Sequence, residues 1–458
     1  MPVAIKIHKR NSYVHFQSFM LLICLVTILR NILSVNIPVS VYLLLSALVA
    51  VICSKSEIIA YMCALLPMGG MCQYRLALFI VTGIYLLKIR KPIIRRIIPL
   101  CLMIMWEVYH APQSQLVLYG LVQEFSELIA ISIVLMDSEV DYSDPLPLRV
   151  FGYMAVWSSI VNFIVCRKYF GFSLSSLTRL GNLSGDIPDF QGMLNPNTNS
   201  FICLIAVSVF LLLKSFGCEK KSDKLIILLL AAFIVFTQSK AALVCLVAVY
   251  FLYYVFDQRR QTTSEDIIQL FFALILCAVA GAVFLRDVIK KVISRFLAAD
   301  ISTGRIAIFK FYHDHLCRDP RYLWKGIGLY RYTKQIRALY GDLWQKYPGI
   351  ATMAKGELVY KPCHMGFQEI VVAWGVIGLL LMGLLFCMML KSSRRIRKKT
   401  NYVTMLIILI FSSQGEFISS GSILLALFIS LLCLNYYNNM PEELPVNEAA
   451  EETGEDRL

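Results

Sequence analysis

Residues 366–390 read GFQEIVVAWGVIGLLLMGLLFCMML, a run with one charged side chain, Glu369. A run of this length and composition can cross a bilayer as a helix, because in lipid each backbone polar group must be bonded within the segment. The whole chain is similar: of its 458 residues 58% are hydrophobic and 16% charged. A soluble protein of this size has no core large enough for so much apolar surface. The sequence therefore predicts an all-α, polytopic integral membrane protein.

Apolar segments recur along the chain and suggest about fourteen transmembrane helices. They fall near 15–35, 38–53, 57–69, 72–88, 97–110, 115–136, 149–166, 199–214, 224–238, 240–256, 266–285, 366–390, 402–414 and 417–434. The first has no small-residue cleavage site, so we expect a retained helix rather than a cleaved signal peptide. Pro67, Gly69 and Gly70 predict a sharp reversal between the third and fourth segments.

Basic residues in the short loops give the expected orientation. They precede the first span and recur after later ones, as in 88–96 and 391–399. The positive-inside rule makes this side cytoplasmic and places both termini there. The predicted organisation is then as follows: 1–285, eleven spans with an outer loop at 167–198; 286–365, one large extracytoplasmic loop; 366–436, three spans; 437–458, an acidic, disordered cytoplasmic tail.

The loop at 286–365 is strongly basic, with 15 Lys/Arg, 6 Asp/Glu and a net charge of +9. Long loops translocate largely regardless of charge, so orientation does not explain this excess, and an anionic ligand would. We do not expect nucleic acid, because the remaining positive charge lies in short connections between spans. The loop is also rich in aromatic residues, which fit either sugar stacking or the packing of a small loop domain. These residues are Tyr322, Trp324, Tyr330, Tyr332, Tyr340, Trp344 and Tyr347.

The sequence gives little indication of a metal site or a disulfide bond. The 14 cysteines include no C-x-x-C, and most lie in apolar runs, where they act as small hydrophobic residues. Cys317 and Cys363 share the long loop, and spacing alone leaves open whether they pair. His313 and His315 form an H-x-H pair, which fits surface histidines better than a metal site. We predict no metal.

Three cationic residues are expected on the outer face. Arg179 lies in the loop at 167–198, Lys240 at the tip of a tight hairpin, and Arg305 early in the long loop. A single such residue commonly extends to lipid headgroups. Three on one face favour an anionic ligand, and Arg can form bidentate contacts with phosphate oxygens.

A histidine closes the long loop. Because imidazole titrates near neutral pH, His364 could take a proton from an attacking hydroxyl group. Glu369 follows five residues later. Taken alone, His364 also fits an ordinary interfacial histidine at the end of a helix.

In this order and topology, these motifs resemble the O-antigen polymerase and O-antigen ligase superfamily, polytopic bacterial membrane glycosyltransferases with one large outer loop. The resemblance covers roughly residues 179–378. STGRIAIF at 302–309 is similar to the family's S-G-R-x-x-I-W, and HMGFQE at 364–369, with Gly375 and Gly378, to H-N-x-x-[LQ]-E followed by G-x-x-G. GIGL at 326–329 resembles the short G-x-G-x between them.

Two further motifs resemble the family less specifically. QSK at 238–240 is similar to S-R at a hairpin tip, and the stretch with Arg179 and Asn197 to R-x-G followed by N-P-N. Two positions depart from the pattern. Lys240 stands where the family has Arg, which keeps the charge but loses the bidentate fork, and Met365 replaces an Asn.

The resemblance implies a GT-C-like fold and metal-independent, inverting glycosyl transfer from an undecaprenyl-diphosphate-linked oligosaccharide, with no cofactor. Arg179, Lys240 and Arg305 would hold the diphosphate and stabilise its departure. His364 would activate the acceptor hydroxyl group, with Glu369 and Asn197 as possible support. The implied location is the outer face of the bacterial cytoplasmic membrane.

The leading hypothesis is a polymerase of repeat units for O-antigen, capsule or exopolysaccharide. An O-antigen ligase-type transferase needs the same donor site, so the sequence leaves it open. A lipid-linked oligosaccharide flippase also fits many spans and a cationic cavity. A transporter needs charge within the membrane, and few charges fall mid-span. The exceptions are Arg30, Glu107, Glu124, Glu127 and Glu416. Expected partners are the lipid-linked donor and acceptor, the bilayer, a chain-length regulator and a flippase.

Overall fold

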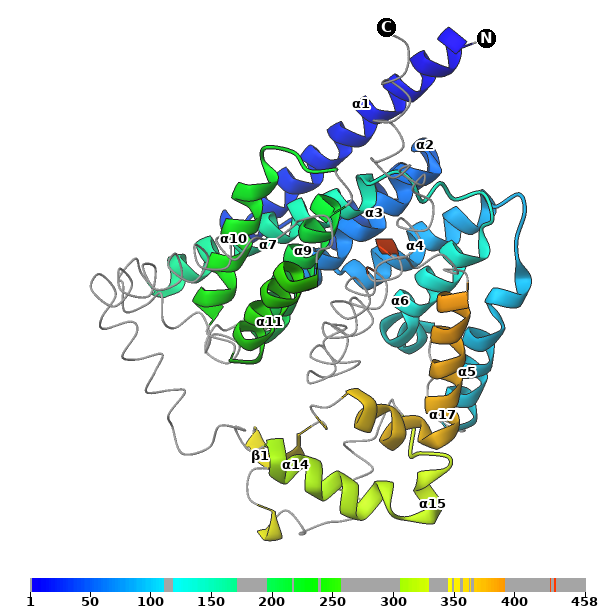
Figure 1. The fold of residues 1–458 in the computed structure, drawn as a ribbon, viewed down its shortest axis with the longest axis vertical. Coiled ribbons are helices and arrows are strands. Elements are labelled where there is room, and N and C mark those ends of the chain that lie inside the picture. Colours follow the sequence, from blue (N-terminus) through cyan, green and yellow to red (C-terminus); the bar gives the residue numbers. More distant parts are fainter. Residues whose placement is uncertain are drawn as a thin grey trace, which may run out of the picture.

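The computed structural model describes residues 2–110, 118–170, 196–215, 218–237, 240–256, 305–328, 345–347, 350–354, 357–361, 363, 366–391, 429 and 432–433. These residues are almost entirely helical (Figure 1). The N-terminal helices are α1 (Pro2–Thr27), α2 (Val39–Ile52), α3 (Lys55–Met68), α4 (Tyr74–Leu87), α5 (Ile98–His110), α6 (Leu118–Met136) and α7 (Leu146–Phe170). They are followed by α9 (Pro196–Ser215), α10 (Asp223–Thr237), α11 (Lys240–Phe256), α14 (Arg305–Tyr312), α15 (Pro320–Leu323) and α17 (Gly366–Lys391).

Short turns of other helix types connect or extend these elements. They are η1 (Ile28–Ile32), η2 (Gly69–Cys72), η3 (Ile94–Arg96) and η4 (His313–Cys317). One antiparallel hairpin, β1 (Ala351–Ala354) and β2 (Glu357–Tyr360), pairs Ala351 with Tyr360. Within the described part of the chain, this hairpin is the departure from the all-α prediction.

Helix α3 lies at the centre of the bundle and packs against α2, α4 and α7. Its residues from Glu57 to Met68 are all buried. Its start is capped, because the backbone N–H of Ser54 donates to the Glu57 carboxylate at 2.8 Å. Its end is the predicted reversal: Gly69 has φ +54°, and the chain turns through η2 into α4.

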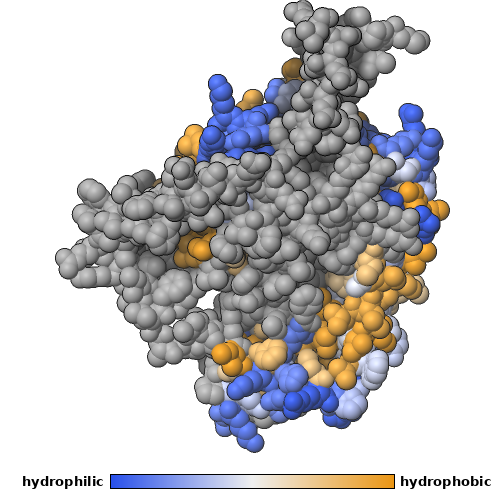
Figure 2. All heavy atoms as spheres, in the orientation of Figure 1, coloured by the Kyte–Doolittle hydropathy of each residue, from blue (hydrophilic) through white to orange (hydrophobic). Residues whose placement is uncertain are grey.

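The apolar character extends to the surface of the bundle. Leu21, Leu87 and Val247 are 72%, 85% and 70% exposed, and similar side chains recur on most helices. Figure 2 shows an apolar flank along α5 and α17 between hydrophilic ends. A monomer in water rarely exposes so much apolar surface, whereas helices facing lipid do.

Helix lengths support part of the predicted topology. Tyr13–Ile32 and Leu146–Val165 are long and apolar enough to cross a bilayer, a test that soluble core helices and signal sequences also pass. In the other apolar helices, the stretches whose side chains the structure describes are shorter, 10–17 residues. The spans predicted at 266–285, 402–414 and 417–434 lie outside the described residues, apart from 429, 432 and 433. So do the tail at 437–458 and most of the loop at 167–198. The count of fourteen spans stays a prediction.

The two ends of the molecule differ. The start of α1 lies at one end, and α14, α15 and β1 lie at the other (Figure 1). Helix α17 packs along α5, so its first residues reach the end that carries α14 and α15.

A buried ion pair joins the starts of two helices, α7 and α10, at the end of the bundle where α1 begins. Nη1 of Arg149 on α7 lies 3.0 Å from both carboxylate oxygens of Asp223 on α10. The same guanidinium group donates to the carbonyl of Cys218. Both charged side chains are almost fully buried, at 6% and 2% exposure.

We predict that Arg149→Leu destabilises the protein by about 3–5 kcal/mol, because it leaves the Asp223 carboxylate buried and unpaired. Thermal unfolding in detergent measures the loss, and adding Asp223→Asn should recover part of it. Arg318→Ala is the matched control, since its ion pair is exposed and such pairs contribute about 0–1 kcal/mol. Equal stability of Arg149→Leu and the wild type would contradict the prediction.

Candidate functional site

The described part of the long loop forms a small packed unit. We call the described residues from 305 to 363, which include α14, η4, α15, the stretch 324–328 and the β1–β2 hairpin, the loop unit. Its centre is a cluster of buried apolar side chains that includes Val372 of α17, so the loop unit and α17 share one core. The buried members are Ile308, Phe311, Tyr312, Leu316, Ile327, Ile350, Tyr360, Cys363 and Val372.

The aromatic residues of the loop divide between the two interpretations. Tyr322 and Tyr347 pack against this cluster, which fits loop packing. Trp324 is 59% exposed, so its ring is available to a ligand. Tyr330, Tyr332, Tyr340 and Trp344 lie outside the described residues.

The histidines and cysteines of the loop unit are engaged in packing. His315 Nε2 lies 3.1 Å from the Tyr347 hydroxyl group, and His313 stacks on Phe309. Within the described ranges, no three His, Cys, Asp or Glu side chains are grouped as metal ligands. Cys317 and Cys363 are free thiols in the same region. Burial raises the pKa of Cys317 to about 11 and that of Cys363 well above its usual value.

Two hydrogen bonds fix α14 beside the start of α17. Gln368 Nε2 donates to the carbonyl of Phe309 at 2.9 Å, and the Tyr312 hydroxyl group donates to the carbonyl of Lys361 at 2.6 Å. Glu369, in the first turn of α17, is 1% exposed. Burial and then the nearby charges of Cys363 and Glu369 raise the pKa of Tyr312 well above its usual value. The Glu369 carboxyl group therefore faces the interior of the loop unit.

Helix α17 is broken at Gly375, where φ is +67° and ψ is −168°. The loop unit bonds to the backbone on both sides of the break. The N–H groups of Ile327 and Gly328 donate to the carbonyls of Val372 (2.9 Å) and Ala373 (2.8 Å), and the N–H of Ile377 donates to the carbonyl of Trp324 (3.4 Å). In a regular helix, Ala373 and Ile377 would bond to each other. The loop unit supplies a replacement partner to each.

Two glycines allow this close approach. A Cβ on Gly326 would lie 2.4 Å from the Ala373 carbonyl oxygen, and a Cβ on Gly375 would lie 2.2 Å from that of Trp324. Both also have positive φ, +72° and +67°, which other residues rarely adopt. The G-x-G and G-x-x-G motifs, about 50 residues apart along the chain, therefore meet at one interface.

The structure describes the backbone of four of the predicted site residues. Arg305 is the first residue of α14 and Glu369 lies in the first turn of α17, and the two helices meet where Phe309 of α14 bonds Gln368 of α17. Lys240 begins α11 and Asn197 lies in the first turn of α9, and α9 packs against α11. Arg179 and His364 lie outside the described residues. Their roles, and any contact between the two pairs of helices, stay predictions.

Sequence reasoning missed two polar residues that position these helices. Gln368 joins α14 to α17, and its signal was an amide in an otherwise apolar run. Asn199, 7% exposed, accepts a hydrogen bond from the Ser159 hydroxyl group at 3.2 Å and so fixes the start of α9 against α7. Its signal was the polar stretch that opens an apolar segment.

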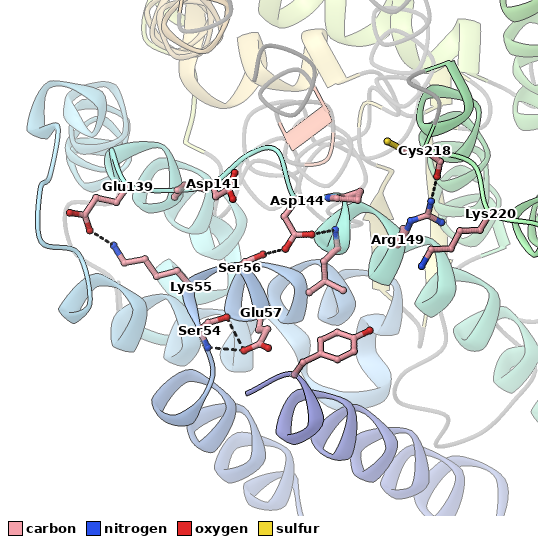
Figure 3. Close-up of a pocket in the computed structure, with 14 residues that line it drawn as sticks. Ser54, Lys55, Ser56, Glu57, Glu139, Asp141, Asp144, Arg149, Cys218 and Lys220 are labelled. Atoms are coloured by element: carbon pink, nitrogen blue, oxygen red, sulfur yellow. Dashed lines mark hydrogen bonds and ion pairs between the residues drawn. The ribbon is translucent and has the colours of Figure 1, made fainter. Parts of the chain in front are cut away.

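A separate cavity of about 750 Å³ lies at the other end of the bundle (Figure 3). The α2–α3 junction, the loop from α6 to α7 and the loop from α9 to α10 line it. Its charged and polar groups pair across these loops. Lys55 bonds Glu139 at 3.1 Å, and Ser56 donates to Asp144 at 2.6 Å. The cavity wall thus cross-links loops far from the loop unit, and its lining includes none of the predicted site residues.

Comparison with known protein families matches most of the predicted site residues to one family. A profile of the O-antigen ligase family matches residues 225–383, from α10 through the loop unit into α17. Over these residues the match confirms the predicted resemblance, and the family it names is one of membrane-associated enzymes. Lys240, Arg305, His364 and Glu369 lie within the match. A search of curated proteins found no match to the chain.

We predict that Gly375→Ala loosens the loop unit by at least about 1–2 kcal/mol, because alanine resists positive φ and its Cβ would meet the Trp324 carbonyl. Hydrogen exchange of the peptide that contains Ile327 and Gly328 should accelerate. Gly383→Ala in the same helix is the matched control, since nothing lies within 4 Å of a Cβ there. Unchanged exchange in Gly375→Ala would refute the assigned docking.

Proposed function

We propose that this protein is a polymerase that joins undecaprenyl-diphosphate-linked oligosaccharide repeat units at the outer face of a bacterial cytoplasmic membrane. The O-antigen ligase family match supports transfer of a glycan by a membrane enzyme. The docking of the loop unit at Gly375 carries the proposal furthest. It sets the helix that begins at Arg305 against the helix that begins two residues after His364.

The donor diphosphate would be held by positive charge at the starts of helices. Arg305 and Lys240 are the first residues of α14 and α11, and Asn197 lies in the first turn of α9. Unpaired N–H groups and the helix dipole favour an anion at such positions. Arg179 would add a further cation from the loop at 167–198. These charges would supply what a divalent cation supplies in other glycosyltransferases.

The proposed reaction is one displacement at the anomeric carbon. The acceptor hydroxyl oxygen attacks this carbon while its bond to the diphosphate oxygen breaks, and the configuration inverts. The diphosphate leaves with the electron pair, stabilised by the cationic side chains. His364 takes the proton of the hydroxyl group. Glu369, buried beside the end of the loop, would stabilise the resulting imidazolium.

A ligase-type transferase is the closest alternative, since it would use the same donor site with another acceptor. A flippase is less well supported, because the two mid-span glutamates with described side chains bond to neighbouring helices. Glu107 accepts a hydrogen bond from Trp374, Glu127 bonds Arg75, and the Arg30 guanidinium group lies over the ring of Tyr42. The side chain of Glu124 and residue Glu416 lie outside what the structure describes.

The proposed setting follows from the same assignment. Both termini and the short basic loops would face the cytoplasm, and the loop unit would face the donor outside. A flippase would deliver the donor to that side, and a chain-length regulator would act on the growing glycan.

Transfer in proteoliposomes with a purified lipid-linked repeat unit tests the proposal. We predict that the wild type makes a ladder of glycan lengths. A single transfer to a different acceptor would instead support a ligase, and translocation without new glycosidic bonds would refute both.

We further predict that Arg305→Ala and His364→Ala each lower the transfer rate by about 100-fold or more, as expected when charge stabilisation or proton transfer is lost. Membrane insertion should be unchanged. Arg318→Ala is the matched control in the loop unit: its side chain is 69% exposed and is one of many cations there, so its loss should change the rate by no more than about threefold. Full activity in either test variant would remove the role assigned to that residue.

A further inference from the structure

The first half of α17 is bound to the loop unit on one side and to α5 on another. Trp106 Nε1 on α5 donates to the backbone carbonyl of Trp374 at 3.0 Å. In return, Trp374 Nε1 donates to the carboxylate of Glu107 at 2.6 Å. Two neighbouring residues of α5 therefore hydrogen-bond one residue of α17, Trp106 to its backbone and Glu107 to its side chain.

This contact is closed to solvent and tightly packed. Trp374 is 2% exposed and Glu107 is 3% exposed. Phe125 of α6 stacks on the Trp374 ring, with 5.8 Å between ring centroids. Gly378 leaves room for that ring, because a Cβ there would lie 2.1 Å from Cβ of Trp374. The position of Trp374 is thus fixed from three helices.

Trp374 directly precedes the break at Gly375. The carbonyls of Val372, Ala373 and Trp374 each accept a hydrogen bond from outside α17. The loop unit supplies the first two donors and α5 the third. Because an unpaired carbonyl in lipid is costly, the loop unit and α5 together stabilise the broken form of the helix.

We propose that Glu107 is a positioning residue for glycosyl transfer, an inference that rests on the proposed function. By holding the Trp374 indole, it sets the direction of the α17 segment that starts beside His364 and carries Glu369. It also keeps the carbonyls of Val372 and Ala373 facing the loop unit. Glu107 lies outside the matched residues 225–383, so the family match does not assign this role.

The chemistry of the contact explains a carboxylate in an apolar helix. A carboxylate accepts a shorter and stronger hydrogen bond from an indole N–H than a neutral group does. Misplacing a catalytic group by about 1 Å can cost about 100-fold in rate. Loss of this bond should therefore lower kcat, while KM for the donor changes little, because the bond orients α17 and Glu107 is assigned no contact with the diphosphate.

The test compares Glu107→Leu, Glu107→Gln and Trp374→Phe in proteoliposomes. We predict that Glu107→Leu and Trp374→Phe lower kcat about tenfold or more, with KM for the donor within about threefold. Glu107→Gln keeps an oxygen acceptor and should stay within about threefold of the wild type. The double variant should fall no further than either single one, since both remove the same bond.

Trp157→Phe is the matched control. The buried Nε1 of Trp157 on α7 has no hydrogen-bond partner among the described residues, so this change removes an indole N–H that none of them accepts. Wild-type kcat in Glu107→Leu would overturn the proposal. So would a loss of kcat in Trp157→Phe equal to that in Trp374→Phe.

A second readout separates this proposal from the proposed function. In Glu107→Leu, hydrogen exchange at Ile327 and Gly328 should accelerate, because their acceptor carbonyls are no longer held in place. If the wild-type protein forms no glycosidic bond, the proposed function fails, and the exchange measurement still decides whether Glu107 holds the break. Unchanged exchange would overturn the positioning role whatever the activity.

Discussion

The structure depends on how the broken helix α17 satisfies its backbone polar groups. A break in an apolar helix is tolerated where the freed N–H and carbonyl groups find other partners. At Gly375, α17 finds them in the G-x-G stretch of the loop unit and in Trp106 of α5. The same hydrogen bonds therefore determine both the shape of α17 and the position of the loop unit on it. An unpaired buried carbonyl costs about 1–3 kcal/mol, so neither partner can leave alone without a comparable loss.

This arrangement fixes the position of the loop unit on α17, so that the unit is not merely connected to α17 by the chain. The shared apolar cluster includes Val372 from α17 and Phe311 from α14, so packing acts in the same place as the backbone bonds. Gln368 adds a third link, through the Phe309 carbonyl. A catalytic pair drawn from the two ends of an 80-residue loop would need such a frame, because reacting groups must be held to within a few tenths of an ångström.

The sequence predicted the positions of the helices well, but not the break in α17 or the contact that forms there. Apolar runs place α5, α7 and α17 within a few residues, because lipid requires the whole run to be apolar. The break at Gly375 was not foreseen, since a glycine in such a run also serves close helix packing. The partner of Gly326 could not be inferred either, because a backbone contact about 50 residues away along the chain has no local signal.

The sequence predicted individual residues of the candidate site, but not most of their partners. Glu107 stood out as a charge within a span, but its partner Trp374 looked like any aromatic residue of a membrane helix. The β1–β2 hairpin was missed because its strands are four residues each and carry no clear alternation. Arg305 and Glu369 were chosen by motif, and the structure adds the contacts between their helices.

The charge of the long loop can now be separated from its structure. Its seat on α17 uses backbone hydrogen bonds, an amide and apolar side chains, none of which draws on the net charge of +9. Arg318 and Arg321 expose 69% and 77% of their side chains, and their ion pairs are with acids in adjacent turns. Because the fold of the described loop does not require these cations, their number fits the proposed anionic donor and the headgroups around it.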